Sequence, residues 1–218
     1  MTPAHDHDHP HPHPHPTQPD SDAPLTYHQR LEIAVRELLM EKGLFSADDV
    51  RRTIERFDTQ TPLLGAKVVA RAWADPEYKK RLLADGTRAV QELGIDMERT
   101  KLVVVENTLQ VHNLIVCTLC SCYPRPVLGF PPDWYKSKAY RSRAVREPRS
   151  VLAEFGTTLP DGVAVRVHDS TADMRYLVLP MRPEGTDGMD ENALAELVTR
   201  DSMIGVTQVK LRAISAAV

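Results

Sequence analysis

Among its 218 residues the sequence has only three cysteines, Cys117, Cys120 and Cys122, all within one run of six residues. An odd number of cysteines so closely spaced excludes a disulfide framework. The sequence has no apolar run of about 18 residues, the length that a membrane-spanning helix needs. It also lacks a basic start followed by an apolar stretch, which a secretory signal would show. We therefore expect a cytoplasmic protein without membrane contact.

Basic residues are not in excess either. The chain has 27 Lys and Arg against 30 Asp and Glu, a formal net charge of −3. No surplus of positive charge is present to neutralise phosphates, which argues against a nucleic-acid-binding protein. Apolar residues make up 42% of the sequence and charged residues 26%, as is ordinary for a globular protein with a buried core.

Residues 1–24 have an unusual composition, with six histidines, seven of the 17 prolines, four aspartates and no Lys or Arg. Alternating His-Pro cannot form a helix or a core, because proline lacks the backbone donor and fixes φ. The composition predicts a disordered tail. Histidine-rich tracts bind divalent metals, so the tail is either a metal scavenger or a solubilising segment with incidental metal affinity.

Helical signals fill residues 25–94. Apolar residues recur with a period of 3.6, and capping or stop residues separate successive segments. We expect a helical arm whose apolar stripes pack against a partner or against the second half of the chain. The expected helices are 26–42 ended by Gly43, one begun by Ser46 with Asp49, 63–74, and one opened by Asp75 and Pro76.

After Gly94 the pattern changes to short runs rich in β-branched residues, which favour strands. We predict an α+β fold, in which the helical N-terminal arm is followed by a layered α/β domain over residues 95–206 and a C-terminal tail over 207–218. The expected strands are 101–108, 112–117, 163–170 and 174–180, the last two forming a β-hairpin, and the expected helices are 133–147, 149–155 and 190–200.

The three cysteines directly follow the strand expected at 112–117. Thiolates are soft ligands that select transition metals. A metal on the sulfurs of Cys120 and Cys122 closes six- and five-membered chelate rings through the backbone nitrogens of Ser121 and Cys122. These four atoms fit one plane, the Cys117 sulfur fits one axial position, and the other stays open for water or substrate. Because backbone amides coordinate only after losing a proton, trivalent cobalt or iron suits this arrangement better than zinc.

Other interpretations compete with this one. A zinc site normally has four N or S ligands, and His112 would have to be the fourth, although a strand histidine is more often satisfied by a hydrogen bond. A redox pair of Cys117 and Cys120 leaves Cys122 without a role. The histidine tail and the cysteines together also suit a non-catalytic zinc-binding or metal-storage protein.

The run VCTLCSCYP over residues 116–124 resembles the metal claw of the nitrile hydratase α subunit. Thr118 resembles the cobalt class of that family, because the iron enzymes carry Ser at this position. Further stretches look like the same subunit, so that the resemblance covers most of residues 26–206; they are 105–113, 127–156, 175–188 and 197–205.

The resemblance implies a hydro-lyase that hydrates a nitrile to the amide at low-spin Co(III), with iron fitting less well. The three cysteines would supply sulfur ligands, and Ser121 and Cys122 would supply amide nitrogens. Cys120 would become a sulfinate and Cys122 a sulfenate, and Cys120, Ser121 and Cys122 would form the catalytic centre. A β subunit, in an αβ or (αβ)2 complex, would contribute arginines that bind the oxidised sulfurs. A cobalt-delivering activator protein is also implied.

The sequence departs from the family's pattern at Arg125, where the family has Trp in a Tyr-Pro-Trp-Pro-like run. The related γ subunit of thiocyanate hydrolase carries Arg there and also has a His/Asp-rich N-terminus, so an alternative function is conversion of thiocyanate to carbonyl sulfide and ammonia. Arg125 either lines the substrate pocket, where it favours an anion or a polar or larger nitrile, or pairs with an acid at the subunit interface. Trp134 either lines the same pocket or fills core.

Overall fold

The computed structural model of the protein describes residues 24–120 and 122–211. Three parts of the chain lie outside these residues, namely 1–23, Ser121 and 212–218. The disorder expected for the histidine-rich tail therefore stays a prediction. Contacts divide the chain into two compact units, Met1–Arg51 and Arg52–Val218. The boundary that the sequence predicts after residue 94, between the helical arm and the α/β domain, stays a prediction.

The first unit contains α1 (Tyr27–Glu41) and the start of α2 (Ala47–Thr59). Thr26 and Gln29 form a capping box that begins α1, in which the Gln29 backbone N–H donates to Thr26 Oγ1 at 3.3 Å. The Asp49 backbone N–H donates to Ser46 Oγ at 3.2 Å, and the Ser46 N–H donates to an Asp49 carboxylate oxygen at 2.8 Å. Both helices expected from the sequence are therefore confirmed.

Three helices of the second unit come next in the chain, and two of them pack against a strand. The Asp75 carboxylate caps the middle one by accepting from the backbone N–H groups of Glu77 and Tyr78. The first packs on α10 (Glu191–Leu197), and the other two contact β1 (Lys101–Glu106). The three helices are α3 (Pro62–Ala74), α4 (Pro76–Ala84) and α5 (Gly86–Gln91).

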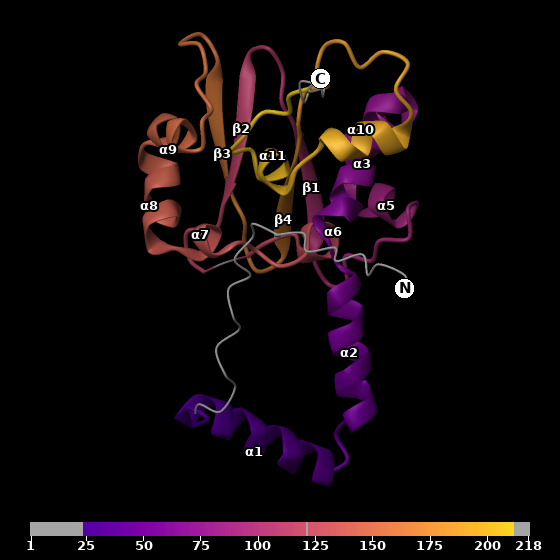
Figure 1. The fold of residues 1–218 in the computed structure, drawn as a ribbon, viewed down its shortest axis with the longest axis vertical. Helices are drawn as coiled ribbons and strands as arrows, with labels where there is room; N and C mark the ends of the chain where they lie inside the picture. The colour runs from indigo at the N-terminus through magenta and orange to yellow at the C-terminus, as the bar shows by residue number, and fades with distance from the viewer. Residues whose placement is uncertain (1–23, 121, 212–218) are drawn as a thin grey trace, which may run out of the picture. The chain divides into compact units, whose positions relative to one another are not determined.

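The strands form two parallel pairs (Figure 1). β1 pairs with β4 (Met174–Leu179), and β2 (Val111–Val116) pairs with β3 (Ala164–Asp169). The β-hairpin expected over 163–170 and 174–180 is therefore wrong, because β3 and β4 each pair with an earlier strand. Parallel strands covered by helices bury nearly continuous apolar runs, and residues 112–116 of β2 are all buried.

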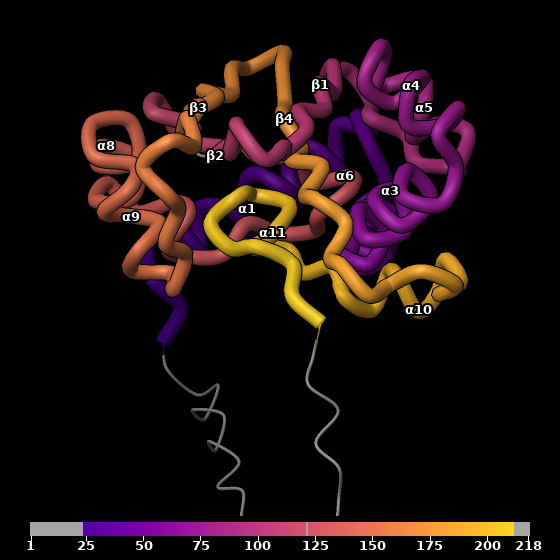
Figure 2. The backbone as a smooth tube through the Cα atoms, turned by 90° about the horizontal axis from the view of Figure 1, so that it is seen from above, coloured from indigo at the N-terminus to yellow at the C-terminus, as the bar shows by residue number. Residues whose placement is uncertain are grey.

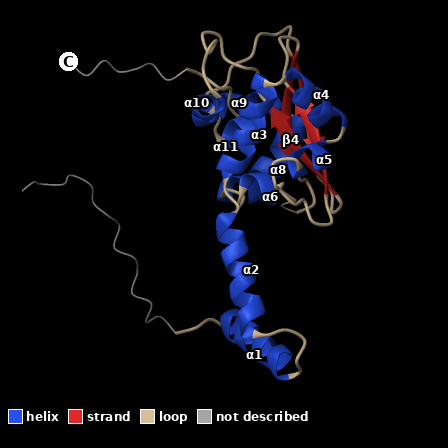
Figure 3. Ribbon diagram, turned by 90° about the vertical axis from the view of Figure 1, so that its right-hand side faces the viewer, coloured by secondary structure: helices blue, strands red, loops and turns tan. Residues whose placement is uncertain are grey.

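Helices cover both flanks of the strands, which completes a layered α/β unit (Figures 1 and 2). On one flank α8 contacts β2 and α9 contacts β3, whereas α11 contacts β4 and covers one face of the strands (Figure 3). The predicted α+β fold is confirmed. The remaining helices are α6 (Arg125–Leu128), α7 (Asp133–Lys136), α8 (Lys138–Arg146), α9 (Pro148–Glu154) and α11 (Arg200–Ile204).

Helix boundaries differ from the sequence expectation where a side chain caps a new helix. The helix expected over 133–147 is two helices, because the Ser137 hydroxyl accepts from the Tyr140 N–H at 3.1 Å and begins α8. The helix expected over 190–200 ends at Leu197, because Thr199 caps the separate helix α11. None of the helices within the described ranges is long and apolar enough to span a bilayer.

Gly205 ends α11 in a conformation that only glycine adopts without strain. Its φ is +90°, and a Cβ there would lie 2.0 Å from the backbone oxygen of Asn113. This close approach fixes α11 against β2, and the Gly205 carbonyl also lies 2.7 Å from Nε2 of the buried His112. The contact positions the C-terminal helix on the strand that leads to the cysteines.

We expect Gly205→Ala to lower the free energy of unfolding by about 3–5 kcal/mol, because two costs add. Alanine is strained in the left-handed conformation, and its Cβ would clash with the Asn113 backbone. Gly188 is the matched control, since its φ is +81° and a Cβ would meet nothing within 4 Å. Gly188→Ala should cost only about 1 kcal/mol. Urea denaturation of both variants measures the difference, and equal losses would contradict the proposed packing of α11.

Candidate metal centre

The chain turns immediately after β2 and brings the three cysteine sulfurs together. Cys117 Sγ lies 3.4 Å from Cys120 Sγ, and Cys120 Sγ lies 3.2 Å from Cys122 Sγ. All three sulfurs lie within 4.8 Å of one another. Cys117 is buried, Cys122 is partly buried and Cys120 is exposed. We call these residues the cysteine cluster; one side of it faces the core and the other faces solvent.

The sulfur separations test which coordination the cysteine cluster fits. A metal–sulfur bond of about 2.3 Å places two sulfurs about 3.3 Å apart at a right angle and about 3.8 Å apart at a tetrahedral angle. The observed 3.4 and 3.2 Å match the right angle. Three thiolates in this arrangement fit a transition metal with octahedral or square coordination better than tetrahedral zinc. Ser121, whose amide nitrogen is a predicted ligand, lies outside the described residues.

The loop that carries the cysteine cluster is tied to the end of β3. The Asp169 carboxylate accepts from the Thr118 backbone N–H at 2.9 Å and from the Thr118 hydroxyl at 2.6 Å. This contact depends on the strand register, which places Asp169 opposite Val116. From α8, the Arg141 guanidinium donates to the Thr118 carbonyl at 3.2 Å. Sequence reasoning missed Asp169 because the expected hairpin hid the pairing of β3 with β2.

Buried tyrosines hold the loop and the end of β2 through hydrogen bonds to backbone carbonyls. The buried Tyr135 donates its hydroxyl to the Cys122 carbonyl at 2.9 Å, and Tyr140 donates to the Ile115 carbonyl at 2.6 Å. Trp134 packs edge-on against Tyr140 and Phe155, with ring centroids 4.9 and 4.7 Å away. Trp134 thus belongs to an aromatic cluster and is not among the described residues that line the cavity beside the cysteines.

A cavity of about 560 Å³ opens beside the cysteine cluster. Its lining has three cations and one acid, Glu98, which is paired with Arg56 at 3.1 Å. The cavity is therefore electropositive. The lining residues are Met97, Glu98, Thr100, Cys120, Cys122, Tyr123, Arg125, Pro126, Phe130, Pro131, Lys136 and Arg175.

The surroundings of Cys122 favour its protonated form. Burial, together with the hydrogen bond to Cys120, raises the pKa of the Cys122 thiol to about 12, and the nearby Arg175 opposes this shift. The metal-free thiol is protonated at neutral pH, so metal binding must release its proton.

Two strand histidines, His112 in β2 and His168 in β3, form hydrogen bonds with groups outside the cysteine cluster. His112 Nε2 lies 2.7 Å from the Gly205 carbonyl oxygen, and His168 Nε2 lies 2.8 Å from Asn113 Oδ1. Burial lowers the pKa of both imidazoles. Within the described ranges, the residues grouped as metal ligands at this site are cysteines only, so His112 is a satisfied strand residue as we expected.

The fold and the cluster together define an α+β protein with a cysteine metal site after a buried parallel strand. The chain matches the family described as "Nitrile hydratase, alpha chain" over residues 26–207. It belongs to the nitrile hydratase alpha chain family, which confirms the family predicted from the claw motif.

Individual relatives support this assignment. The low-molecular weight cobalt-containing nitrile hydratase subunit alpha of Rhodococcus rhodochrous is 56% identical over 176 residues, covering 80% of this chain and 85% of the relative. The thiocyanate hydrolase subunit gamma of Thiobacillus thioparus is 50% identical over 188 residues, covering 81% and 77%. A double mutant of the Fe-type nitrile hydratase from Comamonas testosteroni Ni1 has a similar structure, with a TM-score of 0.79, 41% identity, and coverage of 88% and 97%.

We expect Asp169→Ala to loosen the loop, because its carboxylate holds two donors of Thr118 and each such bond contributes about 1 kcal/mol at an exposed site. The two bonds total about 2 kcal/mol, so the cluster thiols of the metal-free chain should then react up to about thirtyfold faster with a disulfide reagent. Thr118→Val, which removes only the hydroxyl, should show a smaller increase. Asp173→Ala is the control, since the exposed Asp173 contributes a backbone carbonyl that the substitution keeps. Equal reaction rates for the two Asp variants would contradict a holding role for Asp169.

Proposed function

We propose that this chain is the metal-binding α subunit of a cobalt-type nitrile hydratase, which hydrates a nitrile to the amide. The observation that carries the proposal is the convergence of three sulfurs with separations of 3.4 and 3.2 Å beside an open cavity. Cobalt is supported by Thr118 and by the cobalt-containing relative at 56% identity. The similarity to an Fe-type structure makes iron the second choice.

In this proposal Cys117, Cys120 and Cys122 hold the metal through sulfur, and Ser121 and Cys122 also hold it through deprotonated amide nitrogens. A bound trivalent metal supplies Lewis acidity that polarises a nitrile or a water molecule. Oxidation after translation, which needs an external oxidant, would make Cys120 a sulfinate and Cys122 a sulfenate and so add oxygen atoms to two residues that line the cavity. The Cys122 oxygen is the base or nucleophile for the addition of water.

Other residues of the chain then hold the loop and stabilise negative charge on the cysteine sulfurs. Asp169 and Arg141 fix the backbone at Thr118, so the sulfurs keep their positions. Arg175 lies close enough to lower the pKa of Cys122, and it therefore stabilises negative charge on that sulfur. The net reaction adds one water across the C≡N bond, with oxygen bound to carbon and both protons finally on nitrogen.

The proposal includes a β subunit, in an αβ or (αβ)2 complex, an activator protein that delivers cobalt, and a cytoplasmic location for the complex. The family description "alpha chain" supports a β subunit. In α1 no residue is buried, and Leu31, Val35 and Leu38 are each 46–49% exposed at helical spacing. An apolar stripe of this kind is typical of a surface that a partner covers. In this proposal residues 95–206 form the catalytic domain, and residues 25–94 form the helical arm.

A second candidate is a thiocyanate hydrolase-like subunit, and Arg125 favours it. Arg125 lines the cavity, its Nε is buried, and none of the described hydrogen bonds or ion pairs involves its guanidinium. A guanidinium that has no acid partner is suited to binding a small anion. The relative with the thiocyanate hydrolase name, at 50% identity, supports the same alternative.

The test is turnover by the αβ complex produced with cobalt and its activator. We expect amide from a nitrile, and we expect Cys122→Ser to lower kcat by about a thousandfold or more, because it removes a ligand and the reacting oxygen. Leu119→Ala is the control in the same loop, since Leu119 is 88% exposed and offers no ligand atom.

The products separate the candidates. Ammonia and carbonyl sulfide from thiocyanate, without amide from nitriles, would favour the second candidate. No turnover of either substrate, together with readily chelated zinc, would contradict both and leave a metal-storage protein.

A further inference from the structure

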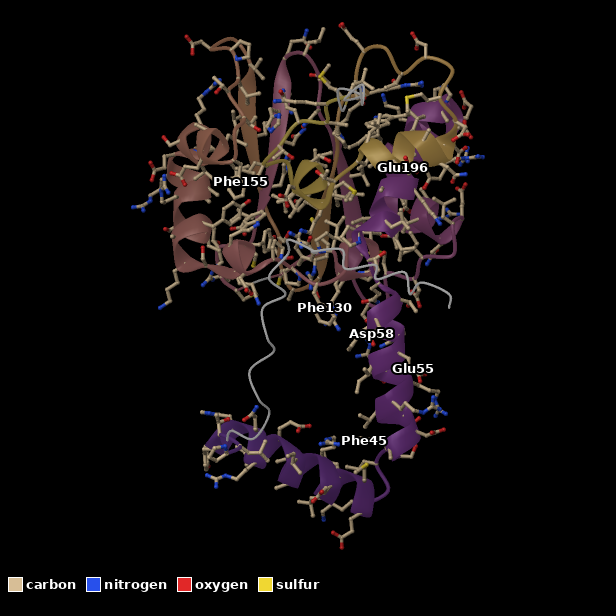
Figure 4. The ribbon with its side chains drawn as sticks, in the orientation of Figure 1. Phe45, Glu55, Asp58, Phe130, Phe155 and Glu196 are labelled. Atoms are coloured by element: carbon tan, nitrogen blue, oxygen red, sulfur yellow. The ribbon has the colours of Figure 1, made fainter. Side chains whose placement is uncertain are left out.

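A second cavity, of about 320 Å³, lies at the end of the strands opposite to the cysteine cluster. Its lining includes Asn107, which follows β1, Pro180, which follows β4, and His112 near the start of β2. From this cavity β2 runs to the cysteine cluster. Phe130, which lines the cavity beside the cysteine cluster, lies at the other end of the strands (Figure 4). We call the second cavity the distal cavity.

Three polar side chains of the distal cavity already have partners within the chain. Nδ2 of Asn107 lies 3.4 Å from Nδ1 of His112, and Nε2 of His112 lies 2.7 Å from the Gly205 carbonyl oxygen. The Arg182 guanidinium donates to the Thr186 carbonyl at 2.6 Å. Because these side chains are satisfied by hydrogen bonds inside the chain, they offer little to a polar ligand.

The rest of the lining is mainly apolar and includes one acid. Leu109 and Met181 are 73% and 41% exposed, whereas Leu159 and Val163 in the same lining are partly buried. Apolar side chains gathered at one exposed place are typical of a surface that another segment covers. Glu184 is exposed, and its carboxylate forms no hydrogen bond or ion pair within the described ranges. The distal cavity therefore fits an apolar segment that carries a cation.

The chain itself approaches the distal cavity after α11. Gln208 and Val209 are part of the lining. A Cβ on Gly185, which directly follows Glu184, would lie 3.2 Å from Cδ1 of Leu211, so Leu211 lies against the same loop. Residues 208–211 therefore run along the wall of the cavity, and Leu211 is the last residue that the structure describes.

Residues 212–218 continue this path and have the composition that the distal cavity fits. They read RAISAAV, with one cation, Arg212, and five apolar side chains. Seven extended residues span about 23 Å, which is enough to cross a cavity of this volume. The family match ends at residue 207, so the segment lies beyond the part of the chain that matches the family.

We propose that residues 212–218 dock in the distal cavity of their own chain, with Ile214 against its apolar wall and Arg212 paired with Glu184. An exposed ion pair contributes little free energy, so burial of Ile214 supplies most of the binding. The docked segment shields the start of β2 from water. This inference does not depend on the proposed function, because neither a metal nor a substrate takes part in the docking.

A zero-length cross-link in the αβ complex tests the ion pair. Arg212→Lys keeps the cation and supplies an amine that a carbodiimide can join to a carboxylate. We expect the link at Glu184 of the same chain about tenfold more often than at Asp187, because docking raises the effective concentration of the two groups. Asp187 is the matched control, since it is an exposed acid of the same loop. Links spread equally over the two acids, or links between two α chains, would contradict the inference.

Hydrogen exchange read by mass spectrometry tests the docking of the whole segment. Deleting residues 212–218 in the αβ complex should speed exchange over 107–112 and 180–186 about tenfold, because water then reaches the distal cavity. Exchange in α8 should stay unchanged. Ile214→Asp should reproduce most of the increase, since a buried carboxylate is costly. Ser215→Asp is its control, because neighbouring side chains of an extended segment point to opposite faces.

Two results would overturn the inference. The first is exchange that is unchanged both by the deletion and by Ile214→Asp. The second is exchange that stays slow after the deletion and becomes fast only when the β subunit is removed, which would assign the distal cavity to the partner.

Discussion

The Asp169 carboxylate accepts from both the backbone and the side chain of Thr118, and this contact ties the loop that carries the three sulfurs to the end of β3. Thr118 directly follows β2 and Asp169 ends β3, so the contact exists only because these strands are parallel and paired in this register. A turn that holds three thiol groups within 4.8 Å needs such support, because ordering the loop costs conformational entropy that no bound metal offsets in the metal-free chain. The loop is anchored on the side of the strands, which leaves Cys120 and Cys122 facing the cavity.

The charges around the cavity suit a centre that becomes negative. A sulfinate at Cys120 and a sulfenate at Cys122 would face three lining cations, whereas Glu98 is neutralised by Arg56 and opposes them little. The charge of Arg175 lowers the pKa of Cys122, and Arg125 stands apart because aromatic rings rather than acids hold it. The positive field of this lining would stabilise the oxidised sulfurs, and arginines of a β subunit would strengthen it.

Local signals predicted much of this molecule, whereas contacts between distant segments were not predictable. The capping pair Ser46 and Asp49 gave the start of α2, and the cysteine spacing led to a cluster whose sulfurs do converge. Strand pairing failed because the short connection after 163–170 suggested a hairpin, and only burial of both faces favours the parallel arrangement. Asp169 was missed for that reason. Phe57 on Arg125 could not be predicted either, because no periodicity relates a ring in α2 to a residue in α6.

The central claim is that the cysteine cluster holds cobalt, and metal content tests it most directly. The αβ complex should be produced in cobalt-containing medium without residues 1–24, since six histidines there would otherwise bind ions. After dialysis against a chelator, elemental analysis should find about one cobalt per α chain, because a low-spin trivalent ion held by three sulfurs exchanges slowly. Zinc, or no metal after the chelator, would contradict the account and point to a structural or storage site.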